Sequence, residues 1–117
     1  MGATEIDGIV TGPAGQKERI TFLVDSGASY TVLPHDVWQR FGLTPKRTER
    51  FSLADGTHIE RQMSEVHIQL PQGDGHTPVV LGEPGDAALL GVITLEELGF
   101  VLNPFSRTLH PMRALLM

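Results

Sequence analysis

Residues 20–34 of this chain read ITFLVDSGASYTVLP, an apolar run that ends at an acidic residue and a tight turn. Residues 22–24 are all apolar, and such a run predicts a central strand that is buried on both faces. Asp25 follows directly, so a carboxylate is expected at the end of a buried strand. Burying a carboxylate is costly unless hydrogen bonds satisfy it, and Ser26 and the free amides of a turn at Gly27 are suitable donors. Gly27 also lets the backbone pass close to the carboxylate.

A hairpin is expected before this stretch and a short helix after it. Apolar residues at 6–10 precede the turn sequence Gly-Pro-Ala-Gly at 12–15, and a second strand then runs to residue 24. This order predicts a β-hairpin. Proline suits the first position of a helix and glycine its left-handed C-terminal cap, so a helix is expected from Pro34 to about Phe41, ending at Gly42.

The rest of the chain predicts further strands and one more short helix. Residues 46–70 return to strands around a hairpin turn at 54–57. Further segments follow in order: a turn at 73–75, a strand at 79–81, a loop at 82–86, a strand at 88–90, a strand at 100–102 and a turn at 103–104. Thr94-Leu95-Glu96-Glu97 matches a capping box, which predicts a helix that starts at Thr94, and Gly99 closes it. About seven or eight strands and two short helices predict an all-β domain of barrel or sandwich type over residues 1–117.

Composition and charge exclude several classes of function. The chain has 117 residues, a formal net charge of −5, and nine scattered Lys and Arg residues, so we expect no nucleic-acid partner and no membrane surface. The chain has no cysteine, which rules out disulfides, thiolate metal sites and a cysteine nucleophile. We find neither a leader-like N-terminus nor an apolar run of about 18 residues, and therefore expect a soluble, cytoplasmic protein.

Five histidines raise the question of a metal site: His35, His58, His67, His76 and His110. None has the i, i+4 spacing or the nearby acidic partner that is typical of zinc enzymes. His58 and His67 could meet across a hairpin, but solvated strand histidines explain the pattern better. We therefore expect no metal and no cofactor.

Four segments resemble the retropepsin-like aspartic protease family. The run Phe22-Leu23-Val24-Asp25-Ser26-Gly27-Ala28, continued by Thr31-Val32-Leu33-Pro34, resembles its active-site segment. Leu89-Leu90-Gly91 is similar to its second signature, two apolar residues and a glycine before a short helix. Leu53-Ala54-Asp55-Gly56-Thr57 falls where the family's flap lies, and residues 98–104 resemble the ending of small bacterial members. The resemblance covers nearly the whole chain.

The resemblance implies a closed β-barrel that forms a symmetric homodimer, with Asp25 as the catalytic residue. Ser26, Gly27 and Ala28 would support it. One carboxylate cannot both activate a water and protonate a leaving amine, and the chain has no second Asp-Ser-Gly or Asp-Thr-Gly. The second carboxylate is therefore expected from the Asp25 of another subunit across a two-fold axis. The implied activity is an aspartic endopeptidase acting on a peptide or protein, with a hairpin flap from each subunit and termini, including residues 112–117, that interleave in the dimer.

Departures from the family keep a second interpretation open. Ser29 and Tyr30 stand where viral relatives carry acidic residues that hold the substrate backbone, and Asp55 lies near the flap tip. A non-catalytic dimer of the same fold, serving as a binding or assembly module, is therefore the alternative, since fold does not fix function. A trypsin-like serine nucleophile is disfavoured, because Val24 and Ala28 replace the flanking glycines and the chain is too short for two barrels.

Overall fold

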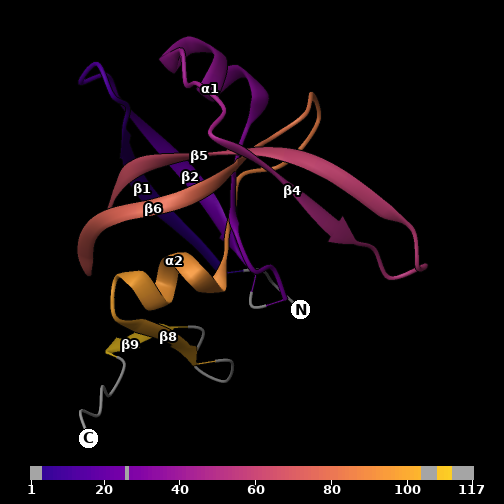
Figure 1. Cartoon of the computed structure of the whole chain (residues 1–117). Coiled ribbons are helices and arrows are strands. Elements are labelled where there is room, and N and C mark those ends of the chain that lie inside the picture. Colours follow the sequence, from indigo (N-terminus) through magenta and orange to yellow (C-terminus); the bar gives the residue numbers. More distant parts are fainter. Residues whose placement is uncertain (1–3, 26, 104–107, 112–117) are drawn as a thin grey trace, which may run out of the picture.

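The computed structural model describes residues 4–25, 27–103 and 108–111, and within them the chain forms nine strands and two short helices. In chain order these elements are β1 (Thr4–Thr11), β2 (Lys17–Val24), β3 (Thr31–Leu33), α1 (His35–Phe41), β4 (Arg47–Ser52), β5 (His58–Leu70), β6 (Gly73–Leu81), β7 (Leu89–Leu90), α2 (Val92–Glu97), β8 (Phe100–Asn103) and β9 (Thr108–Pro111). Figure 1 shows their arrangement. The mostly-β class expected from the sequence is confirmed.

Seven of the strands form one sheet that nearly closes on itself. Their order is β1-β2-β7-β3-β6-β5-β4, and β1 also pairs with β5 through residues 9–11 and 67–69. This extra pairing joins the two ends of a six-stranded set and leaves β4 outside it, paired only with β5. The β4–β5 hairpin therefore extends away from the barrel as an arm (Figure 1). Closing the sheet removes most of the exposed strand edges.

Short β7 organises the centre of the sheet. It runs parallel to β2 through Leu23↔Leu89 and Val24↔Leu90, and antiparallel to β3 through Val32↔Leu89. Strand β3 is in turn parallel to β6. Because β7 lies between β2 and β3, the turn that joins these two strands is placed directly beside the start of α2. The fold thus brings residues 25–30 and residues 90–93 together.

The side chains at the end of β2 alternate between buried positions and positions that are exposed or half-buried. Ile20, Phe22 and Val24 are buried inside the barrel, whereas Thr21 is exposed and Leu23 only half-buried. The expectation that residues 22–24 are buried on both faces is therefore wrong for Leu23. Successive side chains of a strand point to opposite faces, and in this barrel only the inner face is packed.

The first hairpin and the first helix form as expected. Strands β1 and β2 pair throughout their length around the turn at residues 12–16. Pro34, the predicted first helical residue, is instead the N-cap of α1, which begins one position later at His35, and Gly42 ends the helix at φ 62°. The left-handed conformation at Gly42 is one that glycine adopts without steric cost, which confirms its role as the C-terminal cap.

Two local expectations are wrong. Helix α2 begins at Val92 with Gly91 as its N-cap, so Thr94 does not cap it. Thr94 is fully buried, and its hydroxyl is used in contacts with other threonines rather than at the helix end. The expected turn at residues 73–75 lies within β6, because Leu70 pairs with Gly73 and the real turn falls at residues 71–72.

The C-terminal part forms a separate two-stranded sheet. Strands β8 and β9 pair antiparallel from Phe100↔Pro111 to Asn103↔Thr108, and β8 packs against α2 (Figure 1). The expected turn at 103–104 is only half covered, since Pro104 lies outside the described residues. The predicted interleaving of residues 112–117 lies outside them as well. Neither described helix is long and apolar enough to cross a membrane.

Candidate active site

Asp25 lies immediately after β2, at the start of a tight turn. Its amide donates to the Leu90 carbonyl at 3.1 Å, so β7 fixes the backbone of Asp25. The Gly27 amide donates to Asp25 Oδ1 at 2.9 Å, and the Ala28 amide donates to the Asp25 carbonyl at 3.0 Å. The carboxylate is therefore oriented by the turn, while its surface remains exposed in the single chain. Ser26, the other predicted partner, lies outside the described residues.

The start of α2, which follows β7, is hydrogen-bonded to this turn. The Val92 amide donates to the Ala28 carbonyl and the Ile93 amide donates to the Ser29 carbonyl, both at 2.9 Å. These amides belong to the first turn of α2, where backbone N–H groups have no partner within the helix. The turn at residues 25–30 thus supplies carbonyl acceptors for these N–H groups, and the start of the helix holds the turn in place.

Gly91 is required by the close approach of these two segments. A Cβ atom at this position would lie 2.4 Å from the carbonyl carbon of Tyr30 and 2.8 Å from the Ser29 carbonyl oxygen. Backbone atoms cannot move out of the way as a flexible side chain can. Only glycine therefore fits, which gives the Leu89-Leu90-Gly91 segment a physical reason in this chain.

A chain of three buried threonine hydroxyls lies beneath the same turn. The Gly91 amide donates to Thr31 Oγ1 at 3.0 Å, the Thr31 and Thr94 hydroxyl oxygens are 2.5 Å apart, and those of Thr94 and Thr77 are 2.7 Å apart. The Thr77 hydroxyl donates to the Pro78 carbonyl in a longer contact of 3.4 Å. All three threonines are at most 1% exposed.

The direction of this hydroxyl chain follows from counting protons. Among the described residues, Thr94 Oγ1 is the one acceptor for the Thr31 proton, so the Thr94 proton goes to Thr77, whose own proton goes to the Pro78 carbonyl. The reverse direction would leave the buried Thr31 proton without an acceptor, which is costly. The chain ties β3, β6 and α2 to the segment that carries Gly91. The sequence predicted none of it, and its only signal was a threonine that resembled a helix cap.

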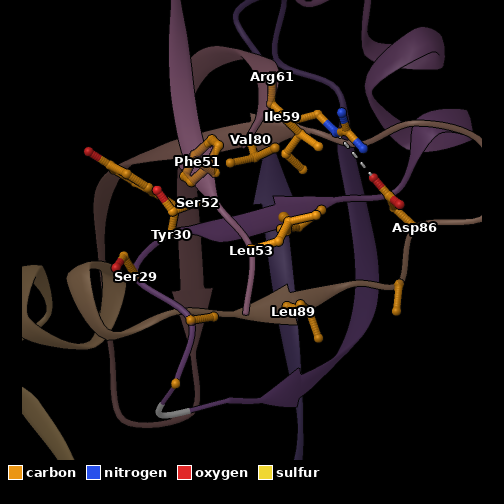
Figure 2. A pocket seen from close by; sticks show the side chains of 14 residues that line it. Ser29, Tyr30, Phe51, Ser52, Leu53, Ile59, Arg61, Val80, Asp86 and Leu89 are labelled. Carbon is orange, nitrogen blue, oxygen red and sulfur yellow. Dashed lines mark ion pairs between the residues drawn. The ribbon is translucent and has the colours of Figure 1, made fainter. Parts of the chain in front are cut away.

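A pocket of about 430 Å³ opens next to the turn (Figure 2). Residues 27–30 form one edge of the pocket, and apolar side chains supplied by five strands form most of its wall. These apolar side chains are Val32, Phe51, Ile59, Val80 and Leu89. Tyr30 stands edge-on to Phe51, with ring centroids 5.9 Å apart, and the Arg47 guanidinium lies 5.8 Å from the Tyr30 ring. An apolar wall beside a carboxylate turn suits an extended peptide with apolar side chains.

Two charged residues that sequence reasoning missed also line this pocket. Arg61 of β5 and Asp86 of the loop before β7 form an ion pair with 3.7 Å between Nε and Oδ2 (Figure 2). They are distant in sequence and share no motif, so the pairing emerges only from the fold.

The predicted flap segment is the turn of the β4–β5 arm. The Leu53 amide donates to the Thr57 carbonyl at 2.8 Å, and Gly56 has φ 88°. Asp55 Oδ1 accepts from the Thr57 hydroxyl at 2.6 Å and from its amide at 2.9 Å, and this bonding lowers the pKa of Asp55 below its usual value. Asp55 is thus occupied within the turn. Of the five predicted flap residues, only Leu53 lines the pocket; Ala54 and the other three do not.

The histidines do not form a metal site in the described part of the chain. His67 of β5 is paired with His76 of β6, with ring centroids 5.3 Å apart, and its Nε2 lies 2.8 Å from Asp74 Oδ2. His58 instead contacts the Ser52 hydroxyl at 3.1 Å. The idea that His58 and His67 meet across a hairpin is wrong, because both lie on β5. No group of three His, Cys, Asp or Glu side chains among the described residues is arranged to hold a metal ion.

Comparison with known proteins identifies the class to which this fold and site belong. The aspartyl protease family matches residues 6–93, which include both the Asp25 turn and the Leu89-Leu90-Gly91 segment. The match spans most of the chain, so the chain belongs to the aspartyl protease family. Membership in this family suggests a hydrolase with aspartic protease activity on a peptide substrate. Comparison with curated proteins found no match.

Proposed function

We propose that the chain is a retropepsin-like aspartic endopeptidase that works as a symmetric homodimer, with Asp25 and the partner subunit's Asp25 as its catalytic pair. The observation that carries this proposal is the exposed Asp25 carboxylate, which the Gly27 amide orients; Asp25 itself does not line the largely apolar pocket, but residues 27–30 of the same turn do. The sequence contains this acidic motif once, so a single chain supplies one carboxylate. A two-fold axis brings each residue opposite its own copy, which supplies the second.

The chemistry follows from two carboxylates that share one proton. Like charges that lie close together do not both ionise readily, so one carboxyl keeps its proton and the pair titrates as a unit. The ionised Asp25 takes a proton from water, which then attacks the scissile carbonyl. The protonated carboxyl polarises that carbonyl and later supplies the proton that the leaving amine needs. No metal and no cofactor enters this proposal.

Several features of the single chain support assembly into a dimer. The catalytic carboxylate is exposed, and the two exposed large apolar side chains among the described residues are Leu53 of the arm and Val101 of β8. In the proposed dimer each arm serves as a flap over the cleft, with Leu53 in contact with the peptide. The substrate lies across the two-fold axis, held by the pockets of both subunits. The net charge of −5 supports a peptide rather than a nucleic acid as substrate.

The test compares the wild-type chain with Asp25→Asn on a randomised peptide library, with Asp36→Asn as the matched control. Asp36 lies on α1 with a side chain that is 87% exposed and does not line the pocket, so its loss changes the same charge outside the pocket. Hydrolysis should disappear in Asp25→Asn, because an amide cannot act as a base, and persist in Asp36→Asn. Sedimentation should show a dimer in all three.

Each other outcome has a clear meaning. Hydrolysis that survives in Asp25→Asn would end the aspartic mechanism. A wild-type dimer that binds peptides without cutting any would instead favour the non-catalytic binding module. Activity of a strictly monomeric chain would refute the shared catalytic pair.

A further inference from the structure

The pocket beside the Asp25 turn carries opposite charges at one end. Among its lining residues, all of which belong to the described chain, only Arg61 and Asp86 are charged. Figure 2 shows the two side chains together at the rim opposite Tyr30 and Ser29. The Arg61 side chain is 24% exposed and that of Asp86 is 36% exposed, so both are partly withdrawn from water and still accessible to a ligand.

Each charged group is held in place by a hydrogen bond to the backbone of a residue nearby in the sequence. Asp86 Oδ2 accepts from the Glu83 amide at 2.8 Å, which fixes the carboxylate on the loop at residues 82–88. Arg61 Nη1 donates to the Glu60 carbonyl at 3.0 Å, which fixes the guanidinium on β5. Their closest atoms, 3.7 Å apart, are beyond normal hydrogen-bond length. The two charged groups therefore attract each other across the pocket rim without forming a direct hydrogen bond.

Both groups retain unused hydrogen-bonding capacity within the described part of the chain. Arg61 has five N–H groups, and only one Nη1 contact is made to a carbonyl. Asp86 uses Oδ2 for the Glu83 amide, while Oδ1 accepts from no described residue. A ligand group that reaches this rim meets a fixed donor and a fixed acceptor side by side.

The chemistry of this rim discriminates between peptide side chains. A carboxylate would bind Arg61 but be repelled by Asp86, and an ammonium or guanidinium group would bind Asp86 but be repelled by Arg61. An aliphatic side chain would remove water from both charges and return no hydrogen bond. A carboxamide accepts through its oxygen and donates through its nitrogen, from two separate atoms in one plane, so it can satisfy both groups at once and adds no charge.

We propose that the Arg61–Asp86 pair makes this pocket select a peptide side chain that ends in a carboxamide, Gln or Asn. The aliphatic stem of that side chain lies along the apolar wall formed by Ile59 and Leu89. This inference rests on the proposed function, because it names the substrate class of the same site. Arg61 and Asp86 are specificity-determining residues under this proposal and take no part in bond cleavage.

The test uses two single substitutions with opposite expected effects. A peptide cleaved by the wild-type protein is varied at each position in turn among Gln, Asn, Leu, Glu and Lys, and kcat/KM is measured. At one position the wild type should prefer the carboxamides by about tenfold or more. Arg61→Gln leaves the acidic group and should shift the preference to Lys. Asp86→Asn leaves the basic group and should shift the preference to Glu.

A charge-swapped double variant and a distant control complete the design. Arg61→Asp combined with Asp86→Arg restores a neutral pair and should return the preference to the carboxamides. Arg40→Gln removes a cation that pairs with Glu18, outside the pocket, and should leave the profile unchanged. Identical profiles in the wild type and both single variants would overturn the proposal. So would a shift in the same direction for both.

Binding separates this inference from the proposed hydrolysis. A set of fluorescently labelled peptides that carry Gln, Asn, Leu, Glu or Lys at each position in turn, chosen without regard to cleavage, is titrated against Asp25→Asn, alone and combined with each pocket substitution, and anisotropy reports their affinity. Carboxamide preference in binding, without cleavage by the wild type, would refute the peptidase and support the pocket assignment. Cleavage whose preference ignores Arg61 and Asp86, with binding that ignores them too, would support the peptidase and refute the assignment.

Discussion

Replacing Thr94 by Val should destabilise the protein more than replacing it by Ser. Both changes act on a fully buried side chain that contacts the hydroxyls of Thr31 and Thr77. Valine keeps the shape and removes the hydroxyl, whereas serine keeps the hydroxyl and removes a methyl group. If burial of apolar atoms governed this site, valine would be the better residue. The direction of the hydroxyl chain predicts the opposite order.

The magnitudes follow from which buried group loses its partner. In Thr94→Val the Thr31 proton has no acceptor, and an unsatisfied buried donor costs about 1–3 kcal/mol, so we expect a loss of about 2 kcal/mol. In Thr94→Ser the hydrogen bonds remain and one buried methyl is lost, worth about 1 kcal/mol. A loss of about 2 kcal/mol is large for a domain whose total stability is about 5–15 kcal/mol.

A double variant makes the reasoning sharper. Thr31→Val removes the acceptor of the Gly91 amide and leaves that buried N–H unsatisfied. Thr31→Val combined with Thr94→Val leaves the same N–H unsatisfied, but the Thr31 proton no longer exists. The double variant should therefore be about as stable as Thr31→Val alone, with a coupling of about 2 kcal/mol between the two sites.

Urea unfolding followed by fluorescence measures these differences, with each variant tested at several protein concentrations so that dimer association is separated from folding. Thr94→Val that is as stable as the wild type would refute the hydroxyl chain. So would additive losses in the double variant, because they would mean that Thr31 and Thr94 do not share a hydrogen bond.

Three further predictions concern other parts of the chain. Thr57→Val removes the hydroxyl that lowers the pKa of Asp55 most, so an NMR titration should show that this pKa moves up toward 3.8. In the wild type, the contribution of this hydrogen bond to folding stability is present above the unfolded pKa of Asp55 and is lost as pH falls through the lower folded pKa. Gly91→Ala should cost clearly more than the about 1–2 kcal/mol expected for Gly15→Ala, whose added Cβ meets open space at φ 86°, and equal losses in thermal melts would contradict the packing argument. Deleting residues 112–117 should weaken dimerisation and peptide hydrolysis together in a concentration series, whereas a fully active truncated monomer would refute the shared site.

The fold could be predicted largely because its local signals agree with its tertiary contacts. The turn at residues 12–15, the glycine cap at Gly42 and the hairpin turn at 54–57 all lie where the sequence placed them. Each depends on neighbours within a few residues, which sequence patterns report directly. The tight turn after Asp25 could be predicted in the same way, because an apolar strand ends there and Gly27 follows, although the triplet by itself does not reveal a function.

The errors occurred where a distant contact overrode a local pattern. Thr94 followed by Glu96 and Glu97 has the letters of a helix cap, yet hydrogen bonds to Thr31 and Thr77 occupy its hydroxyl inside the core. Residues 73–75 have the composition of a turn, yet pairing with β5 extends β6 through them. Spacing rules cannot weigh such contacts, because the competing partners come from other strands.

Contacts between distant segments also position the candidate site, so the site depends on more than the residues next to Asp25 in the sequence. Asp25 is held through Leu90, and its turn through Val92 and Ile93, so the Asp25 carboxylate is positioned by residues more than sixty positions away. In a proposed dimer, any displacement of one carboxylate is repeated in its copy, and the error in the distance between them is doubled. A rigid support under each turn is therefore worth more in this assembly than in an enzyme whose two carboxylates belong to one chain. The buried threonine chain and Gly91 supply that support, which is why substitutions beneath the turn, outside the pocket and away from the peptide, should affect hydrolysis.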